Sequence, residues 1–152
     1  MIKPIFKFSA FVLLVMKKDE HILLHKRINT GWGNGFFAVP SGHLDSGETV
    51  LQAAVRLGKE ILNVKIKTED ISMVHVLYFK GYDGLEHAAF TVNVNAWEGE
   101  FCNQEPDKHE DVIWFPVAQI PEKTLPRHKI ILKDIDNNIF YGEDGWGKQT
   151  LI

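Results

Sequence analysis

The stretch that decides the fold reads Gly42-His43-Leu44-Asp45-Ser46-Gly47-Glu48, then seven residues, then Arg56-Leu57-Gly58-Lys59-Glu60-Ile61-Leu62-Asn63-Val64. From Thr49 to Leu62 it contains no proline and a single glycine, and its residue types favour an α-helix. Asn63 suits the end of that helix, because asparagine tolerates the left-handed backbone found at helix C-termini. The sequence therefore predicts a loop with two glycines that leads directly into one helix.

Three charged residues of this stretch are candidates for a site. Arg56 and Glu60 are four residues apart, so on a helix they share a face and can form an ion pair. Glu48 immediately precedes the helix, where a carboxylate is favoured by the N-terminal dipole, so it is a candidate for capping as well as for a functional role. The residues alone leave a surface ion pair and a chemical site both open.

In its order and spacing the stretch resembles the box of the Nudix hydrolases, G-x5-E-x7-R-E-U-x-E-E-x-G-U, where U is a bulky apolar residue. The positions that keep the register are Gly42, Glu48, Arg56, Glu60 and Val64. The likeness to small nucleotide-type members covers roughly residues 6 to 146, and its further segments are Arg27, the run 37–43, Trp114-Phe115-Pro116, Tyr141 and Gly145-Trp146. It implies an α+β fold, an α/β/α sandwich with a mixed sheet, formed by a single domain over residues 1–152.

The resemblance also implies an activity, the hydrolysis of a nucleoside diphosphate linked to another group with the help of Mg²⁺ or Mn²⁺. Such cations prefer oxygen ligands, and they assist by neutralising phosphate oxygens and activating a water molecule. The implied metal ligands are Glu60, a backbone carbonyl beside Gly42, and an acidic residue shortly before Trp114. Glu110 and Asp111 both lie in that neighbourhood, and we favour Glu110. The implied catalytic residues are Glu60, Glu48, Arg56 and Glu110.

Four positions depart from the family's box. Leu57 and Ile61 stand where the family has glutamates, Gly58 replaces a bulky apolar residue, and Asn63 replaces a glycine. With about 100° per residue and Arg56 at zero, Leu57 lies near 100° and Ile61 near 140° on the helix. We expect both side chains to face the cleft, because the apolar residues on the far side of the helix already supply a core stripe; these are Leu51, Val55 and Leu62.

Two functions remain open from this pattern. The first is a divalent-metal-dependent nucleotide pyrophosphohydrolase that is weakened by Leu57 and Ile61. The second is a catalytically impaired Nudix domain that binds a nucleotide or a protein partner. The substrate contacts we expect are Arg27, Trp32 and Phe37. Trp32 lies in a glycine-rich loop, residues 29–35, where an aromatic side chain is hard to explain by packing and can stack on a base.

The remaining chain predicts strands and a second helix. Apolar runs separated by turn residues indicate two hairpins, and Pro126 suits the first turn of a helix that runs to about Asn137. The expected strands are residues 8–16, 21–27, 36–39, 71–79, 88–97 and 112–115, while 41–48 is expected to be a loop. Strands followed by one helix, more strands and a final helix favour an α+β or mixed-sheet sandwich.

Composition narrows the class of protein. The chain has 152 residues, of which 45% are hydrophobic and 24% charged, as in an ordinary globular domain. Its net charge of -3 lacks the basic excess typical of proteins that bind duplex nucleic acid. The apolar run Phe8–Met16 is too short to cross a membrane. The single cysteine, Cys102, favours a reducing compartment, and we expect the cytoplasm.

Overall fold

The computed structural model describes residues 1–147, so residues 148–152 of the expected domain lie outside the described part of the chain. An eight-stranded mixed sheet runs in the order β3-β2-β1-β6-β5-β8, with β4 paired to β1 and β7 paired to β2. The elements are β1 (Ser9–Lys18), β2 (His21–Arg27), β3 (Phe37–Ala38), β4 (Ser41–His43), α1 (Val50–Leu62), β5 (Ile71–Lys80), β6 (Glu86–Val94), β7 (His109–Pro116), α2 (Pro126–Asp136) and β8 (Tyr141–Asp144), with 3₁₀ turns at Thr68–Asp70 and Val117–Gln119.

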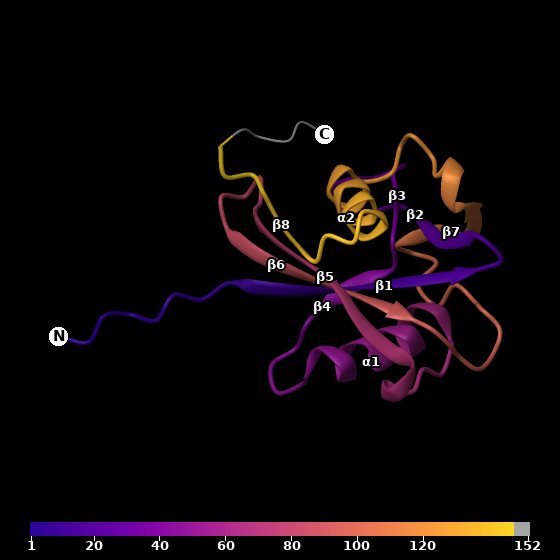
Figure 1. Ribbon diagram of the computed structural model, residues 1–152, viewed down its shortest axis with the longest axis horizontal. Coiled ribbons are helices and arrows are strands. Elements are labelled where there is room, and N and C mark those ends of the chain that lie inside the picture. Colours follow the sequence, from indigo (N-terminus) through magenta and orange to yellow (C-terminus); the bar gives the residue numbers. More distant parts are fainter. Residues whose placement is uncertain (148–152) are drawn as a thin grey trace.

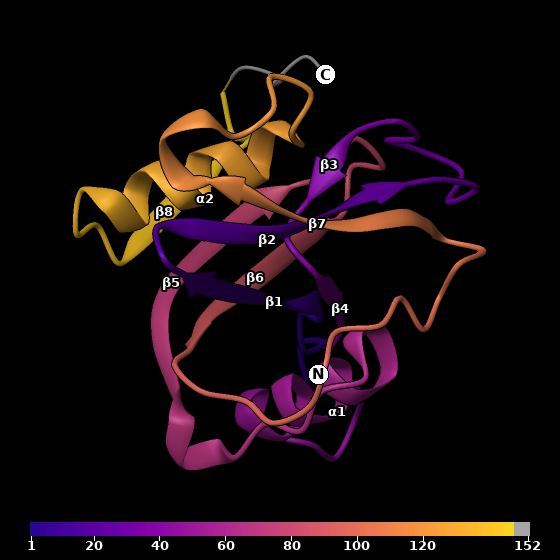
Figure 2. The ribbon, with the colours of Figure 1, turned by 90° about the vertical axis from the view of Figure 1, so that its right-hand side faces the viewer.

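The central strand β1 is covered on both faces. Its alternate residues Val12, Leu14 and Met16 belong to the core on the α1 side. Leu13 and Val15 belong to the core on the α2 side. Figures 1 and 2 show the two helices on opposite faces of the sheet. Because both faces of β1 are buried, its sequence is a continuous apolar run instead of an alternation of apolar and polar residues. With a helix on each face of the mixed sheet, the predicted α/β/α sandwich is confirmed.

The strand pairing is more complex than two hairpins. β5 and β6 pair along their length, from Ile71 opposite Val94 to Lys80 opposite Glu86, as the predicted hairpin requires. β1 pairs with β2 only next to their turn. Along most of its length β1 instead runs parallel to β6 and antiparallel to β4. The expectation of a loop from residue 41 is therefore wrong at its start, since Ser41–His43 form a strand against β1.

Helix α1 begins and ends at polar caps. The Thr49 side chain accepts a hydrogen bond from the backbone N–H of Gln52, and the Gln52 side chain bonds back to the Thr49 N–H. Asn63 ends the helix in the left-handed conformation, as predicted, with φ of 58°. Because Thr49 caps this helix, the capping role considered for Glu48 is wrong.

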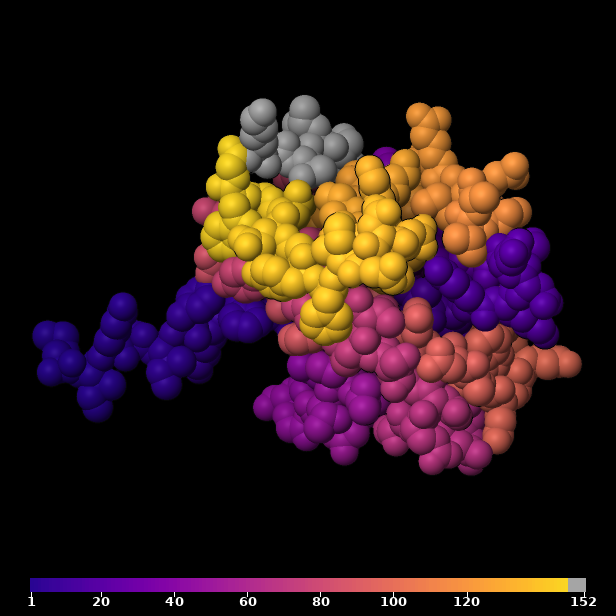
Figure 3. All heavy atoms as spheres, viewed as in Figure 1, coloured from indigo at the N-terminus to yellow at the C-terminus, as the bar shows by residue number. Residues whose placement is uncertain are grey.

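The chain begins with a segment that precedes the first strand of the sheet. Residues 1–8 lack regular secondary structure and extend away from the body of the molecule (Figures 1 and 3). Among residues 1–147, neither helix has both the length and the apolar character needed to cross a membrane.

Candidate functional site

Arg56 is the centre of the charged network at the start of α1. Its Nε donates to one carboxylate oxygen of Glu48 at 3.0 Å, and its Nη2 donates to the other at 2.6 Å. Nη1 donates to Glu60 at 3.0 Å. Two planar groups thus meet in the paired geometry that only arginine provides. The structure therefore brings together three of the four predicted catalytic residues, Glu48, Arg56 and Glu60.

The same network is tied to the backbone of β4. Arg56 Nη2 also donates to the carbonyl oxygen of His43 at 2.9 Å, and the Glu48 carboxylate accepts the backbone N–H of Asp45 at 2.8 Å. The hydrogen bonds from Arg56, followed by the one from Asp45, lower the pKa of Glu48. The hydrogen bonds to Glu48 raise the pKa of Arg56. Arg56 therefore stays charged and holds the loop 43–48 onto the helix.

Leu57 and Ile61 do not face a cleft. They are only 4% and 2% exposed and belong to the core cluster beneath the sheet. Leu57 packs directly on Gly42, where an added Cβ would lie 2.4 Å from a Leu57 methyl carbon. The expectation of a cleft orientation is wrong, because α1 buries an arc wide enough to include both residues along with Ala53 and Ala54.

The other two departures from the family's box also have structural causes. A Cβ at Gly58 would lie 2.4 Å from the Ile66 side chain, so glycine allows the chain to fold back closely after the helix. Asn63 supplies the left-handed cap that glycine provides elsewhere. The altered box is therefore packed as a coherent helix with its own complementary neighbours.

These residues offer few free oxygen ligands to a divalent cation. Two of the three family carboxylate positions hold buried apolar side chains, and Glu60, with its side chain 55% exposed, is engaged by Arg56. Glu110 lies on β7 and forms an ion pair with Lys26 at 2.9 Å. Within residues 1–147, no three His, Cys, Asp or Glu side chains are grouped so that they could hold a metal ion. No described contact joins Glu60 to Glu110, so the predicted metal set of Glu60, Gly42 and Glu110 remains a prediction.

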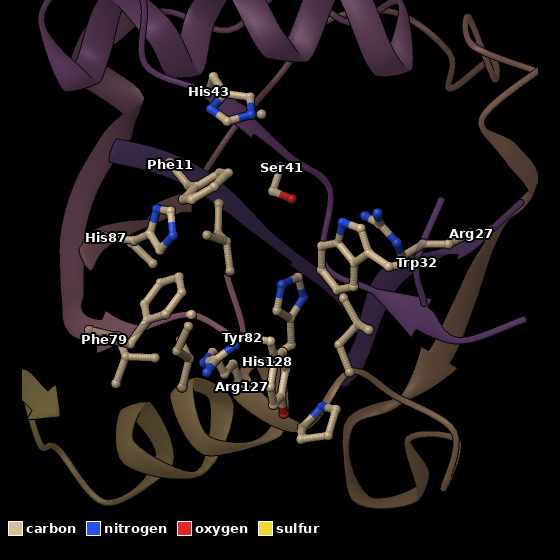
Figure 4. Close-up of a pocket in the computed structure, with 18 of the residues that line it drawn as sticks. Phe11, Arg27, Trp32, Ser41, His43, Phe79, Tyr82, His87, Arg127 and His128 are labelled. Atoms are coloured by element: carbon tan, nitrogen blue, oxygen red, sulfur yellow. The ribbon is translucent and has the colours of Figure 1, made fainter. Parts of the chain in front are cut away.

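A cavity of about 480 Å³ lies beside the box and shares the strand β4 with it. Ser41, Gly42 and His43 form one wall, and residues of β1, β5, β6 and the start of α2 form the others. Its size suits a mononucleotide-sized ligand. Figure 4 shows His43 at the end toward α1, and Tyr82, Arg127 and His128 at the end toward α2.

Two of the three predicted substrate-binding residues line this cavity. The Arg27 guanidinium lies 4.2 Å from the centre of the Trp32 ring, and both side chains border the cavity (Figure 4). Arg27 Nε is buried and has no hydrogen-bond partner in the described part of the chain. Trp32 is 56% exposed, so it forms an open aromatic rim. Phe37 instead packs edge-on against Phe115, at a centroid distance of 5.0 Å, and is not a lining residue.

Sequence reasoning missed the α2 side of the cavity. Arg127 is held by Asp144 and the Lys80 carbonyl oxygen, and its guanidinium lies over the rings of Phe79 and Tyr82. His128 is the next residue. No local motif marks either one, because only the tertiary fold brings the first turn of α2 opposite β4. The one available signal was Pro126, which predicts a helix start but no function.

Comparisons with known proteins agree with this geometry. The family model described as NUDIX domain matches residues 6–135. A MutT NUDIX hydrolase from Burkholderia pseudomallei is 25% identical with a TM-score of 0.76, over 84% of this chain and 98% of that one. A MutT protein from Bacillus halodurans is 18% identical, with a TM-score of 0.72 and 95% of both chains covered. A MutT protein from Methanosarcina mazei is 13% identical, with a TM-score of 0.74, over 86% and 94%.

Proposed function

Because this chain belongs to the NUDIX domain family, we propose that it binds a nucleoside diphosphate-linked small molecule in the cavity beside β4 and hydrolyses it weakly. The family and its MutT-like neighbours support, in general, hydrolysis of nucleoside diphosphate-linked compounds. Nudix hydrolases generally use divalent cations such as Mg²⁺ or Mn²⁺. The substrate contacts and the reduced rate are our own inferences.

The proposed reduction in hydrolysis rate rests on the burial of Leu57 and Ile61. Both side chains fill the core, so the helix presents one carboxylate, Glu60, where the family presents three. Removing a single preorganised charged group from an active site commonly costs a hundredfold or more in rate. The effects of losing two groups from one site need not add, but Glu60 is left as the one carboxylate of the three that the family has on this helix.

The cavity supports binding. Arg27 offers a positive charge whose buried Nε–H has no hydrogen-bond partner among the described residues, and a phosphate group is a fitting counter-ion for it. Trp32 offers an exposed ring on which a base can stack, a contact that contributes about 1–3 kcal/mol. The Arg56 network fixes β4, which forms the shared wall of box and cavity.

A panel experiment tests this proposal. We would measure the binding of nucleoside diphosphates and sugar nucleotides by calorimetry, and phosphate release in the presence of Mg²⁺ or Mn²⁺. We expect binding, with turnover at least a hundredfold below that of a Nudix enzyme with a complete box. Failure of every compound to bind would contradict the proposal and favour a protein partner, and turnover equal to that of a complete box would contradict the impaired rate.

The intact network of Glu48, Arg56 and Glu60 favours a second candidate, a hydrolase with a reduced metal site. In that case Glu60, Glu110 and a backbone carbonyl beside Gly42 are the groups that would hold the cation. Glu60→Gln should then lower Mn²⁺ affinity or hydrolysis by at least tenfold, while exposed Glu69→Gln, as a matched control, should leave both unchanged. Equal turnover in Glu60→Gln and the parent would eliminate this candidate.

A further inference from the structure

The chain carries an extended and mostly apolar arm, residues 1–8, ahead of β1. The arm projects from the sheet into solvent (Figures 1 and 3). Its root is fixed, because the side chains of Ser9 and His87 are hydrogen-bonded where β1 runs beside β6. Its most exposed apolar residues, each at 85% or more, are Met1, Ile2 and Ile5. A contiguous exposed apolar surface of this kind is typical of a segment that binds another surface.

The arm leads onto a row of aromatic side chains on the body of the molecule. The rings of Phe6 and Phe8 stack with centroids 6.0 Å apart, and Phe8 makes an edge contact with Tyr78 at 5.7 Å. Tyr78 stacks in turn on Trp146 at 5.4 Å. Phe6, Phe8 and Trp146 are 59%, 50% and 43% exposed. These four rings, called the aromatic row below, therefore form one continuous strip that is open to solvent.

A glycine turn places Trp146 in this row. Gly145 has a φ of 81°, in the left-handed region that favours glycine. A Cβ at this position would lie 2.4 Å from the carbonyl oxygen of Lys80. The chain after β8 can therefore turn tightly against the end of β5. The Trp146 indole N–H then donates to the Tyr78 carbonyl oxygen at 3.4 Å, which holds the ring over Tyr78 although much of it is exposed.

The aromatic row lies on the α1 face of the sheet. Side chains of a strand point alternately to its two faces. Val12 and Leu14 of β1 belong to the core on the α1 side, so Phe8 continues that face. Glu143 of β8 pairs in register with Tyr78 and shares the face with it. Figure 1 shows the arm leaving at the left, near β6 and β8, whereas α1 lies below the middle of the sheet.

The charges of the arm complement those of this face. The arm carries Lys3 and Lys7 and no carboxylate. The face carries two carboxylates, Glu143 and Glu86, and one cation, Lys80, which pairs in register with Glu86. Within residues 1–147 none of these five side chains is in an ion pair. Carboxylates beside the row would repel an anionic lipid surface, but they attract a segment that has two lysines.

A second copy of this chain supplies such a segment. We propose that two copies form a symmetric dimer in which the arm of each lies on the aromatic row of the other. A two-fold axis lets both arms and both rows be covered at once. With about 150–250 Å² for each aromatic side chain, the arm, the row and the exposed Tyr141 offer on the order of 800 Å² per copy, as one partner does in a stable interface. This assembly goes beyond the proposed function and does not depend on it.

Analytical ultracentrifugation of the full chain tests the dimer. We expect the parent to be dimeric at micromolar concentration. The arm variant Ile2→Ser with Ile5→Ser should weaken dimerisation at least tenfold, and so should the face variant Tyr141→Ser with Trp146→Ser. Ile113→Ser, which removes an exposed apolar side chain from β7, is the control and should leave the dimer unchanged. If the face variant folds poorly, the arm variant still decides, because Ile2 and Ile5 are almost fully exposed.

Mixing the two variants tests which surfaces meet. A dimer of either variant has no contact between an intact arm and an intact row, whereas a mixed dimer has one. An equimolar mixture should therefore contain more dimer than either variant alone. A monomeric parent, a dimer that both variants leave unchanged, or a mixture no more dimeric than its components would each overturn the proposal. Binding of a monomeric parent to vesicles of anionic phospholipid would assign the arm to a membrane surface instead.

Discussion

Arg56 joins three parts of the chain that are separate in sequence: the loop carboxylate of Glu48, the helix carboxylate of Glu60 and the His43 backbone. The spacing of the charged residues predicted that the helix pair would meet. It did not predict the bond to the His43 carbonyl, because backbone groups leave no pattern in a sequence. That bond connects the box to the wall of the cavity, so Arg56 positions a cavity wall that it does not itself line.

Arg56→Lys tests this positioning role. A lysine ammonium cannot make the paired contact to Glu48 and still reach Glu60 and His43. We expect the Tm to fall by at least about 3 °C, measured by calorimetry, and nucleotide affinity to fall with it. Lys59→Arg, on the exposed face of the same helix, is the control. Weaker binding at an unchanged Tm would instead indicate that Arg56 contacts the ligand.

Strands β2 and β7 carry a pair of buried histidines. The rings of His25 and His109 stack with centroids 3.7 Å apart. Neither ring nitrogen of His25 has a hydrogen-bond partner in the described part of the chain. Nδ1 of His109 has none there either, whereas its Nε2 lies 3.5 Å from the Glu105 carboxylate. Burial, with the nearby His109, His128 and Arg27, holds the pKa of His25 well below its ordinary value. Burial also lowers the pKa of His109.

This pair should make the protein acid-sensitive. The folded state resists protonating His25 while the unfolded chain protonates it near pH 6.5, so the unfolded state binds more protons below that pH. Stability is thus fully present above about pH 6.5 and falls as the pH drops, by at most about 1.4 kcal/mol per pH unit for one histidine. His25→Phe should flatten the slope of Tm between pH 6.5 and 5, and His21→Gln should not. An unchanged slope in His25→Phe would contradict this assignment.

Helix α1 shows which features of an element can be predicted from sequence. Its length and its end at Asn63 follow from local residue preferences, and both were predicted. The direction in which Leu57 and Ile61 point was predicted wrongly. A helical wheel gives angles between residues of one helix, but it does not say where the sheet lies. The close approach of α1 to β4 at Gly42 decides the direction, and that contact joins segments that are separate in sequence.

The double variant Leu57→Glu with Ile61→Glu, which restores the family's carboxylates, tests the buried orientation of these two positions. Two carboxylates replace buried apolar side chains and have no cations beside them in the core, which costs at least about 3 kcal/mol in the free energy of unfolding. We expect the Tm to fall by about 6–12 °C, with no gain in Mn²⁺ affinity. Gln52→Glu with Lys59→Glu, on the exposed face, should change the Tm far less. A double variant that stays stable and gains hydrolysis would show that these positions can face the cleft.

The cavity is a property of the whole molecule. Its lining comes from the glycine-rich loop 29–35, β4, the hairpin tip 81–83 and the start of α2. Sequence reasoning identified Arg27 through the family resemblance, and Trp32 because a tryptophan in a glycine-rich loop is unusual. It missed Arg127 and His128, which resemble any polar residues at the start of a helix. They line the cavity because the fold places β4 and the start of α2 on opposite sides of it.

A ligand in this cavity should stabilise the whole fold, because it contacts segments from both ends of the chain. Ligand at a hundred times its Kd adds about 2.7 kcal/mol to the free energy of unfolding, which raises the Tm by about 5–11 °C for a chain of this size. Trp32→Ala should keep nearly the same Tm without ligand, since Trp32 is 56% exposed. Its shift at the same nucleotide concentration should be smaller, because losing the stacking contact weakens binding by about 1–3 kcal/mol. Equal shifts for this variant and the parent, measured by thermal denaturation, would place the nucleotide away from Trp32.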